Sequence, residues 1–155
     1  MNYKSDYAAE NLILVINPRH PFTKIGVFNN KNLVFLKSIK HDEAKLAKFA
    51  KYEDQTEFRG KAIIDELKEN EIDINHIKLI ISRGGLIKPV KSGVYAVNEK
   101  MITDLHNSLQ GTDIVNVGGL VSDYLAKSMP EAKAIVADPV VVDEYEEEAR
   151  ITGLP

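Results

Sequence analysis

Continuous aliphatic runs alternate along this chain with segments whose apolar residues recur at helical spacing. Three such runs come first, at residues 12–16, 25–28 and 33–39, and the turn-forming sequence Asn29-Asn30-Lys31-Asn32 separates the second from the third. Short aliphatic runs bounded by turn residues predict strands. Because the three runs follow one another closely, they are predicted to form an antiparallel meander.

The pattern changes to a helical period from Asp42 onward. Its apolar residues fall on one face of a first helix and then of a second, namely Leu46, Phe49 and Ala50, followed by Phe58, Ala62, Ile63 and Leu67. Asp54 and Glu57 have the spacing of a capping box, in which side chains satisfy free N–H groups of the first helical turn. The second helix is therefore predicted to begin next to Asp54.

Two more strand-like runs, at residues 77–82 and 134–137, enclose two further helical segments. Asn98 is predicted to cap the first of these helices, and Gly111 to separate it from the second. Their apolar faces are formed by Met101, Ile102, Leu105 and Leu109, and then by Val117, Val121, Tyr124 and Leu125.

The order of these elements predicts the fold class. Crossovers that contain helices favour parallel pairing of the later strands and place the helices over the sheet. The order is typical of a ribonuclease-H-like, actin-like ATPase domain, an α/β fold whose mixed sheet joins a three-strand antiparallel meander to parallel strands. The length of 155 residues, without repeat or linker, fits one such domain over residues 1–155.

Composition narrows the classes of partner. The formal net charge of −3 gives no indication of a nucleic-acid surface, and the absence of cysteine excludes disulfides and thiolate metal sites. No apolar run approaches the roughly 18 residues of a membrane span, and the first ten residues lack a signal-peptide core, so no membrane partner and a cytoplasmic location are expected. The histidines lack metal-ligand spacing. The glutamates at 144 and 146–148 are interpreted as a solvated face.

Three polar residues directly follow predicted strands: Asn17, Arg83 and Asp138. Open α/β sheets bind ligands beyond the carboxyl ends of their parallel strands. An asparagine offers a donor and an acceptor, an arginine a planar fork for carboxylate or phosphate, and an aspartate a hard ligand for Mg²⁺. Together these residue types suit phosphoryl transfer to an oxygen nucleophile.

The segments around these residues resemble those of butyrate kinases, in the acetate kinase family. The similar stretches are Asn17-Pro18 with the sequence TKIGVF at 23–28, ISRGGLIKP at 81–89, GVYAVNEKM at 93–101, DPVVVDE at 138–144 and ARITG at 149–153. The resemblance covers nearly all of the chain after Leu12.

The resemblance implies an enzyme that phosphorylates a short-chain carboxylate with ATP and Mg²⁺ through two actin-like domains, of which this chain resembles the N-terminal one. Arg83 would hold the carboxylate or the migrating phosphoryl group, and Asp138 would help to place Mg²⁺. The residues implied along the phosphate path are Asn17, Thr23, Lys24, Gly84 and Gly85.

Two stretches depart from the family pattern. The family has glycine and hydroxyl residues after Asn-Pro, where this chain has Arg19, His20, Pro21 and Phe22. Pro21 lacks an N–H donor, Phe22 replaces a hydroxyl group and Arg19 adds bulk, so this loop is predicted not to wrap a phosphate. Asp113 stands where the family has a histidine facing the phosphoryl group, and its negative charge would oppose charge stabilisation there.

The sequence therefore leaves two functions open. One is a butyrate kinase-like phosphotransferase of which this chain is one domain; the other is a related domain that has lost catalysis and serves as a binding or regulatory module. The isolated domain is predicted to be inactive and to bind ATP and Mg²⁺ weakly. The expected partners are a short-chain carboxylate or acyl phosphate and a C-terminal kinase domain, on this or another chain, while a homo-oligomer remains open. A ribonuclease-H-like nuclease is rejected because residues 12–16 contain no metal-binding carboxylate.

Overall fold

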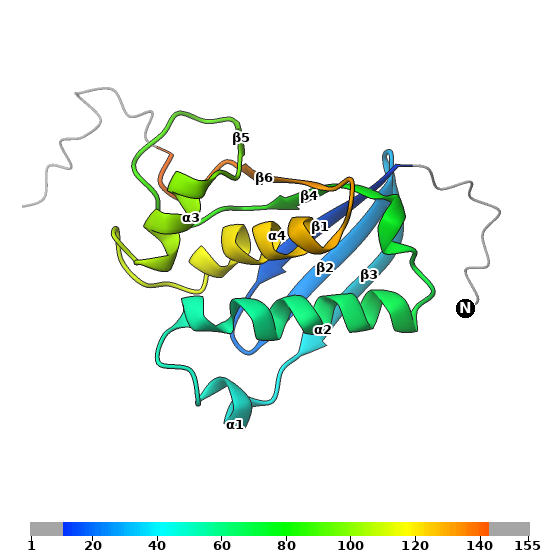
Figure 1. The fold of residues 1–155 in the computed structure, drawn as a ribbon, viewed down its shortest axis with the longest axis horizontal. Coiled ribbons are helices and arrows are strands. Elements are labelled where there is room, and N and C mark those ends of the chain that lie inside the picture. The colour runs from blue at the N-terminus through cyan, green and yellow to red at the C-terminus, as the bar shows by residue number, and fades with distance from the viewer. Residues whose placement is uncertain (1–10, 143–155) are drawn as a thin grey trace, which may run out of the picture.

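The computed structural model describes residues 11–142, and within them six strands form one sheet in the order β3-β2-β1-β4-β6-β5 (Figure 1). The strands are β1 (Leu12–Pro18), β2 (Phe22–Asn29), β3 (Asn32–Lys40), β4 (Ile77–Ser82), β5 (Val94–Ala96) and β6 (Lys133–Ala137). The meander is confirmed, because β1 pairs antiparallel with β2 and β2 antiparallel with β3. Parallel pairing of the later strands is also confirmed, for β1 with β4 and for β4 with β6.

The edge strand β5 was not predicted from the aliphatic runs. It has only three residues, pairs antiparallel with β6 and leaves Val94 65% exposed. A strand this short, with little buried surface, carries almost no hydrophobic signal.

The helical segments are α1 (Glu43–Leu46), η1 (Tyr52–Gln55), α2 (Thr56–Glu69), η2 (Ile74–His76), α3 (Glu99–His106) and α4 (Asn116–Ser128). α2 and α4 lie against the same side of the sheet (Figure 1). Their apolar faces meet one face of β1, β2 and β4 in a core that includes Leu14, Ile25, Ile63, Ile80 and Val121. This sheet with its covering helices is the α/β, actin-like architecture predicted from the element order.

Three local predictions about the helices were wrong. The first predicted helix is only the four-residue α1, which ends at Leu46, before Phe49 and Ala50. Asp54 does not cap α2: it lies within the 3-10 turn η1, where its carboxylate accepts a hydrogen bond from the Lys51 N–H. The turn runs directly into α2, whose N-cap residue Gln55 makes no side-chain capping bond. Leu109 is 59% exposed because α3 ends three residues earlier, whereas Asn98 caps α3 as predicted by accepting from the Met101 N–H.

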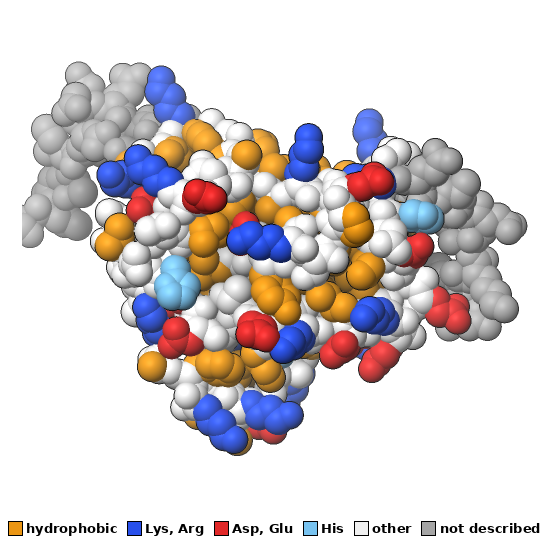
Figure 2. Space-filling view, viewed as in Figure 1, with side chains coloured by type: hydrophobic (Ala, Val, Ile, Leu, Met, Phe, Trp, Pro, Cys, Tyr) orange, Lys and Arg blue, Asp and Glu red, His pale blue; other side chains and the backbone are white. Residues whose placement is uncertain are grey.

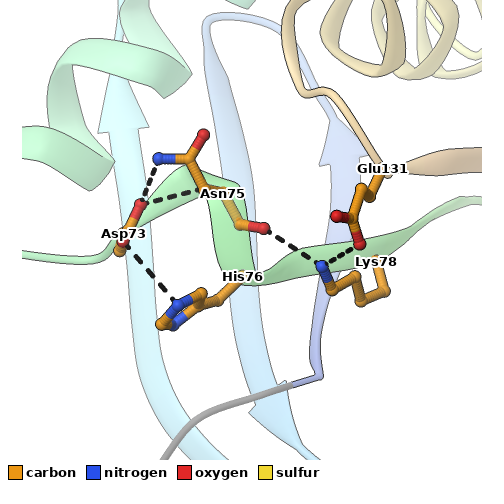
Figure 3. A network of polar contacts seen from close by, with 5 residues as sticks. All are labelled: Asp73, Asn75, His76, Lys78 and Glu131. Carbon is orange, nitrogen blue, oxygen red and sulfur yellow. Dashed lines mark hydrogen bonds and ion pairs between the residues drawn. The ribbon is translucent and has the colours of Figure 1, made fainter.

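The amino ends of the parallel strands are joined at the surface (Figure 3). Lys78 at the start of β4 pairs with Glu131, just before β6, and also donates to the Asn75 carbonyl. Asp73 accepts from the backbone N–H and the side chain of Asn75, with both distances 2.9 Å. These contacts tie η2, β4 and β6 together at the edge of the sheet opposite the predicted site.

The surface over the helices carries no large patch of one charge. Figure 2 shows lysine and arginine side chains interspersed with aspartate and glutamate on this face. Several are paired, as in Lys61 with Glu57 and Lys127 with Asp123. No helix among residues 11–142 is long and apolar enough to cross a membrane.

Candidate carboxylate and phosphate site

The strand register places Asn17, Arg83 and Asp138 at the same edge of the sheet. Ile16 lies opposite Ser82, and Ser82 opposite Val136, so β1, β4 and β6 end at nearly the same level. β2 starts at this edge, where Lys24 pairs across from Asn17. We call this region, with its adjoining loops, the carboxyl edge.

The carboxyl edge gathers positive charge. Arg19, Lys24 and Arg83 are all exposed there, and none of them forms an ion pair with another residue of the described chain. The Lys24 Nζ lies 5.7 Å from the centroid of the Phe22 ring. Unneutralised cations at the ends of parallel strands favour an anionic ligand.

Asp138 follows β6 at this edge. It has a positive φ of 40°, and its Oδ1 accepts from the Ser92 hydroxyl at 2.7 Å and the Gly93 N–H at 2.9 Å. These two hydrogen bonds lower the pKa of Asp138, so the side chain is ionised at neutral pH. No group of three or more histidine, cysteine or acidic residues that could hold a metal occurs within residues 11–142.

The first turn of α4 lies between the loops that follow β1 and β4. A Cβ at Gly118 would come within 3.3 Å of the Ser82 Cβ and 3.7 Å of the Pro18 Cδ. This approach brings the amino end of a 13-residue helix next to the strand ends. The partial positive charge of that end adds to the field for anions.

Gly84 and Gly85 are buried and serve packing in this structure. Gly84 has a φ of 74°, which favours glycine, and a Cβ there would be 3.0 Å from the Val136 Cβ. A Cβ at Gly85 would lie 2.6 Å from the Asn116 Cα. Both glycines therefore let the loop after β4 pack tightly against β6 and α4.

Thr23 points into the protein and not toward the edge. It is 1% exposed, and its hydroxyl oxygen lies 2.8 Å from the His41 Nε2 and 2.8 Å from the Arg59 Nη1. In this arrangement its hydroxyl is engaged by interior partners, so Thr23 supports the loop that precedes it without presenting a donor to the edge.

The loop of residues 19–22, called the 19–22 loop below, turns its carbonyl groups toward interior donors. The Arg59 Nη1 donates to the carbonyls of Arg19 at 3.1 Å and Phe22 at 3.2 Å, and the His41 N–H donates to the Pro21 carbonyl at 2.9 Å. The Arg19 N–H is bonded to the Phe22 carbonyl at 2.8 Å. With that N–H engaged and none on Pro21, few backbone donors remain for a phosphate.

A second buried polar network fixes the start of α4. Glu53 is 1% exposed and accepts from the Thr112 hydroxyl at 2.7 Å and the Asn116 Nδ2 at 2.6 Å. Burial opposes ionisation of Glu53, but the hydrogen bonds from Asn116 and Thr112 outweigh it and lower its pKa. Asp113, at the position of the family histidine, accepts from the Val115 N–H at 2.9 Å, which shapes the turn leading into α4.

His41 gives the fold a dependence on pH. Burial, reinforced by the charge of Arg59, lowers its pKa from 6.5 to about 4. As pH falls, His41 therefore takes up a proton in the unfolded chain before it does so in the folded one. The contribution of the neutral histidine to stability is fully present above pH 6.5 and is lost progressively toward pH 4. The expected loss is roughly 3 kcal/mol.

Urea unfolding of the wild type and His41→Gln at pH 7.0 and 4.5 measures this loss. The glutamine variant removes the ionisable group, so it should lose less stability than the wild type between the two pH values. His76→Gln, at an exposed histidine, is the control and should follow the wild type. Equal losses in wild type and His41→Gln would contradict the assignment.

A separate open groove of about 430 Å³ lies between η1, α3 and α4. Its lining includes Asp54, His106, Asp123 and Lys127, and none of the site residues predicted from the sequence. The polar residues predicted at the strand ends therefore lie at the carboxyl edge and not in this groove.

Sequence reasoning missed the interior residues that hold the carboxyl edge in place: His41, Glu53, Arg59 and Asn116. One signal was present, because Arg59 precedes Ile63 and Leu67 at intervals of four and so belongs to the buried face of α2. Glu53 and Asn116 are 63 residues apart and gave no local sign of their contact.

Known proteins were compared with this chain in sequence and in fold. No family model matches the chain. Butyrate kinase 1 from Clostridium acetobutylicum is 40% identical over 142 residues, which are 92% of this chain and 40% of that protein. The chain is therefore similar to butyrate kinase over nearly all of its length. It spans about two fifths of that relative's length.

The fold agrees with this similarity. The crystal structure of acetate kinase from Entamoeba histolytica superposes with a TM-score of 0.55, covering 93% of this chain and 39% of that one. The two are 16% identical, so this likeness shows the shared fold alone.

Proposed function

We propose that this chain is one domain of a carboxylate kinase and that its carboxyl edge holds a short-chain carboxylate together with the phosphoryl group. The observation that carries the proposal is the convergence of Arg83, Lys24 and Asp138 at one edge. The first two are cations without a described ion-pair partner, and the third is an ionised carboxylate. Homology to butyrate kinase supports butyrate as the substrate class.

Each residue has a distinct role in this proposal. Arg83 binds the carboxylate or phosphoryl oxygens through its planar fork, and Lys24 with Asn17 lines the path of the phosphoryl group. Asp138 is the residue proposed to ligate Mg²⁺, which would neutralise phosphate charge when bound. The remaining ligands and the grip on ATP come from the rest of the kinase, as a second domain on this chain or on a partner.

A second candidate is a binding or regulatory module without catalysis. The 19–22 loop favours it, because its carbonyls are held by Arg59 and His41 and it offers few donors to a phosphate. Asp113 adds to this, since it puts a carboxylate, bonded to the Val115 N–H, where the family has a histidine. Both candidate functions, as proposed here, involve an anion bound at the carboxyl edge. They differ in whether acyl phosphate is formed there.

Thermal unfolding with butyrate and inorganic phosphate tests the shared requirement. A ligand at 100 times its dissociation constant stabilises the fold by about 2.7 kcal/mol, which corresponds to a rise of roughly 5–10 °C in Tm for a domain of this size. Arg83→Ala should abolish the rise, and Arg83→Lys should retain part of it. Lys133→Ala removes an exposed cation at the opposite edge and should behave as wild type. An unchanged rise in Arg83→Ala would refute the proposed site.

A further inference from the structure

Arg59 is the most completely buried cation of the described chain. It lies in the first turns of α2 with 0% exposure, directly beneath the 19–22 loop. Its Nε donates to the Gln55 Oε1 at 3.0 Å, and its Nη1 donates to two loop carbonyls and to the Thr23 hydroxyl. One guanidinium thus joins α2, the 19–22 loop and the start of β2.

The partners of Arg59 are all neutral. Carbonyl, amide and hydroxyl oxygens accept its hydrogen bonds, and no ion pair to a carboxylate is present within residues 11–142. Its Nη2 is buried and has no hydrogen-bond partner. The buried carboxylate of Glu53 accepts hydrogen bonds from Thr112 and Asn116 instead. A buried charge without a counter-charge is costly to the fold.

Because the acceptors are neutral, no negative charge offsets the positive charge of the guanidinium. Desolvation lowers the pKa of Arg59 only to about 10, so it carries its full charge at neutral pH. The carbonyls that it binds belong to the residues that follow Asn17 at the carboxyl edge. Its charge therefore acts from beneath the place where the proposed function puts an anion, with less screening by water than an exposed lysine would have.

We propose that Arg59 is a positioning residue of the carboxyl-edge site: it fixes the 19–22 loop through the Arg19 and Phe22 carbonyls and supplies unneutralised positive charge beneath the bound anion. This inference rests on the proposed function, because it assigns Arg59 to the same anion site. It differs from a purely structural clamp in that the charge itself contributes to anion affinity.

The test uses the full chain and three variants. Arg59→Met keeps the side-chain length but removes the charge and the donors, while Arg59→Lys keeps the charge and loses the planar fork. Lys61→Met, two residues away on the exposed face of α2, is the control. Inorganic phosphate is titrated at low and high salt and followed by amide chemical shifts. The same spectra report the pKa of His41 and the hydrogen exchange of the Arg19 and His41 amides.

Arg59→Met is expected to weaken phosphate binding about tenfold at low salt and to reduce its salt dependence. It should also raise the pKa of His41, because the charge of Arg59 now contributes to lowering it. The Arg19 and His41 amides should exchange faster, since the loop carbonyls lose their donor. Arg59→Lys should keep most of the phosphate affinity with a looser loop, and Lys61→Met should match the wild type in every readout.

Failure of this inference is distinguishable from failure of the proposed function. If the wild type binds phosphate and a folded Arg59→Met binds it equally well, Arg59 has no role in the site and the inference is overturned. If the wild type binds no phosphate, the proposed function fails, and the contribution of charge to affinity fails with it. Should Arg59→Met not fold, Arg59→Lys decides: retained affinity supports the charge role, and affinity reduced to that of Arg83→Ala overturns it.

Discussion

Alone, this chain should form no acyl phosphate from butyrate, ATP and Mg²⁺. In-line transfer requires the carboxylate, the nucleotide and the metal in one arrangement, and such positioning accounts for roughly 7–11 kcal/mol of a barrier. The chain spans 40% of its butyrate kinase relative, and Asp138 is the carboxylate that it is proposed to contribute at the carboxyl edge. Losing this contribution to lowering the barrier corresponds to a decrease in rate of about five orders of magnitude or more.

Hydroxylamine trapping of acyl phosphate measures this expected loss. The samples are the wild type, Arg83→Ala and a variant with the family's glycine and hydroxyl residues restored at positions 19–22. None should exceed background without the rest of a kinase. With a C-terminal kinase domain added, the restored variant should outperform the wild type, because one well-placed donor to a developing charge is worth about 2.7–4 kcal/mol. Robust, Arg83-dependent turnover by the unmodified chain alone would contradict the half-enzyme account.

Asn116→Ala should cost roughly 3–5 kcal/mol of unfolding free energy. Asn116 is fully buried and makes three connections: its Nδ2 donates to the Glu53 carboxylate and to the Gly111 carbonyl, and its Oδ1 accepts from the Leu86 N–H at 2.7 Å. Alanine would leave a buried charge and two backbone groups without these partners. The loss is a large share of the about 5–15 kcal/mol that stabilises a typical domain.

Urea denaturation at pH 7 gives the size of this effect. Asn107→Ala is the matched control, since Asn107 is exposed and makes no described side-chain hydrogen bond, and it should change stability by less than about 0.5 kcal/mol. Because Asn116 begins α4 beside the carboxyl edge, a folded Asn116→Ala should also bind phosphate more weakly. A cost near that of Asn107→Ala would show that the Glu53 network does not fix α4.

The strand pattern of this fold was readable from the sequence because continuous aliphatic runs reflect burial in a sheet. The run at residues 12–16 became most of β1, and the turn-forming asparagines before Leu33 gave the reversal between β2 and β3. Helix starts were less predictable. The spacing of Asp54 and Glu57 matched a capping box, but the chain forms a 3-10 turn at Asp54 whose own hydrogen bonds occupy that carboxylate.

The sequence predicted where the candidate site residues lie on the sheet, but not which way their side chains point. Strand ends placed Asn17, Arg83 and Asp138 at one edge, because the carboxyl ends of parallel strands point to the same side of the sheet. Alternation along β2 decides that Lys24 faces solvent while Thr23 faces His41 and Arg59, and the resemblance alone did not reveal this. The supporting contacts join residues 18 to 63 positions apart, beyond the reach of any local pattern.

The amide chemical-shift map of the folded chain, recorded during titration with butyrate and inorganic phosphate, tests the central claim most directly. The account predicts that the largest shifts occur at Asn17, Arg83, Asp138 and the first turn of α4, and that Arg83→Ala removes them. Shifts centred on the groove between η1, α3 and α4, or a map unchanged by Arg83→Ala, would contradict the claim that the carboxyl edge is the anion site.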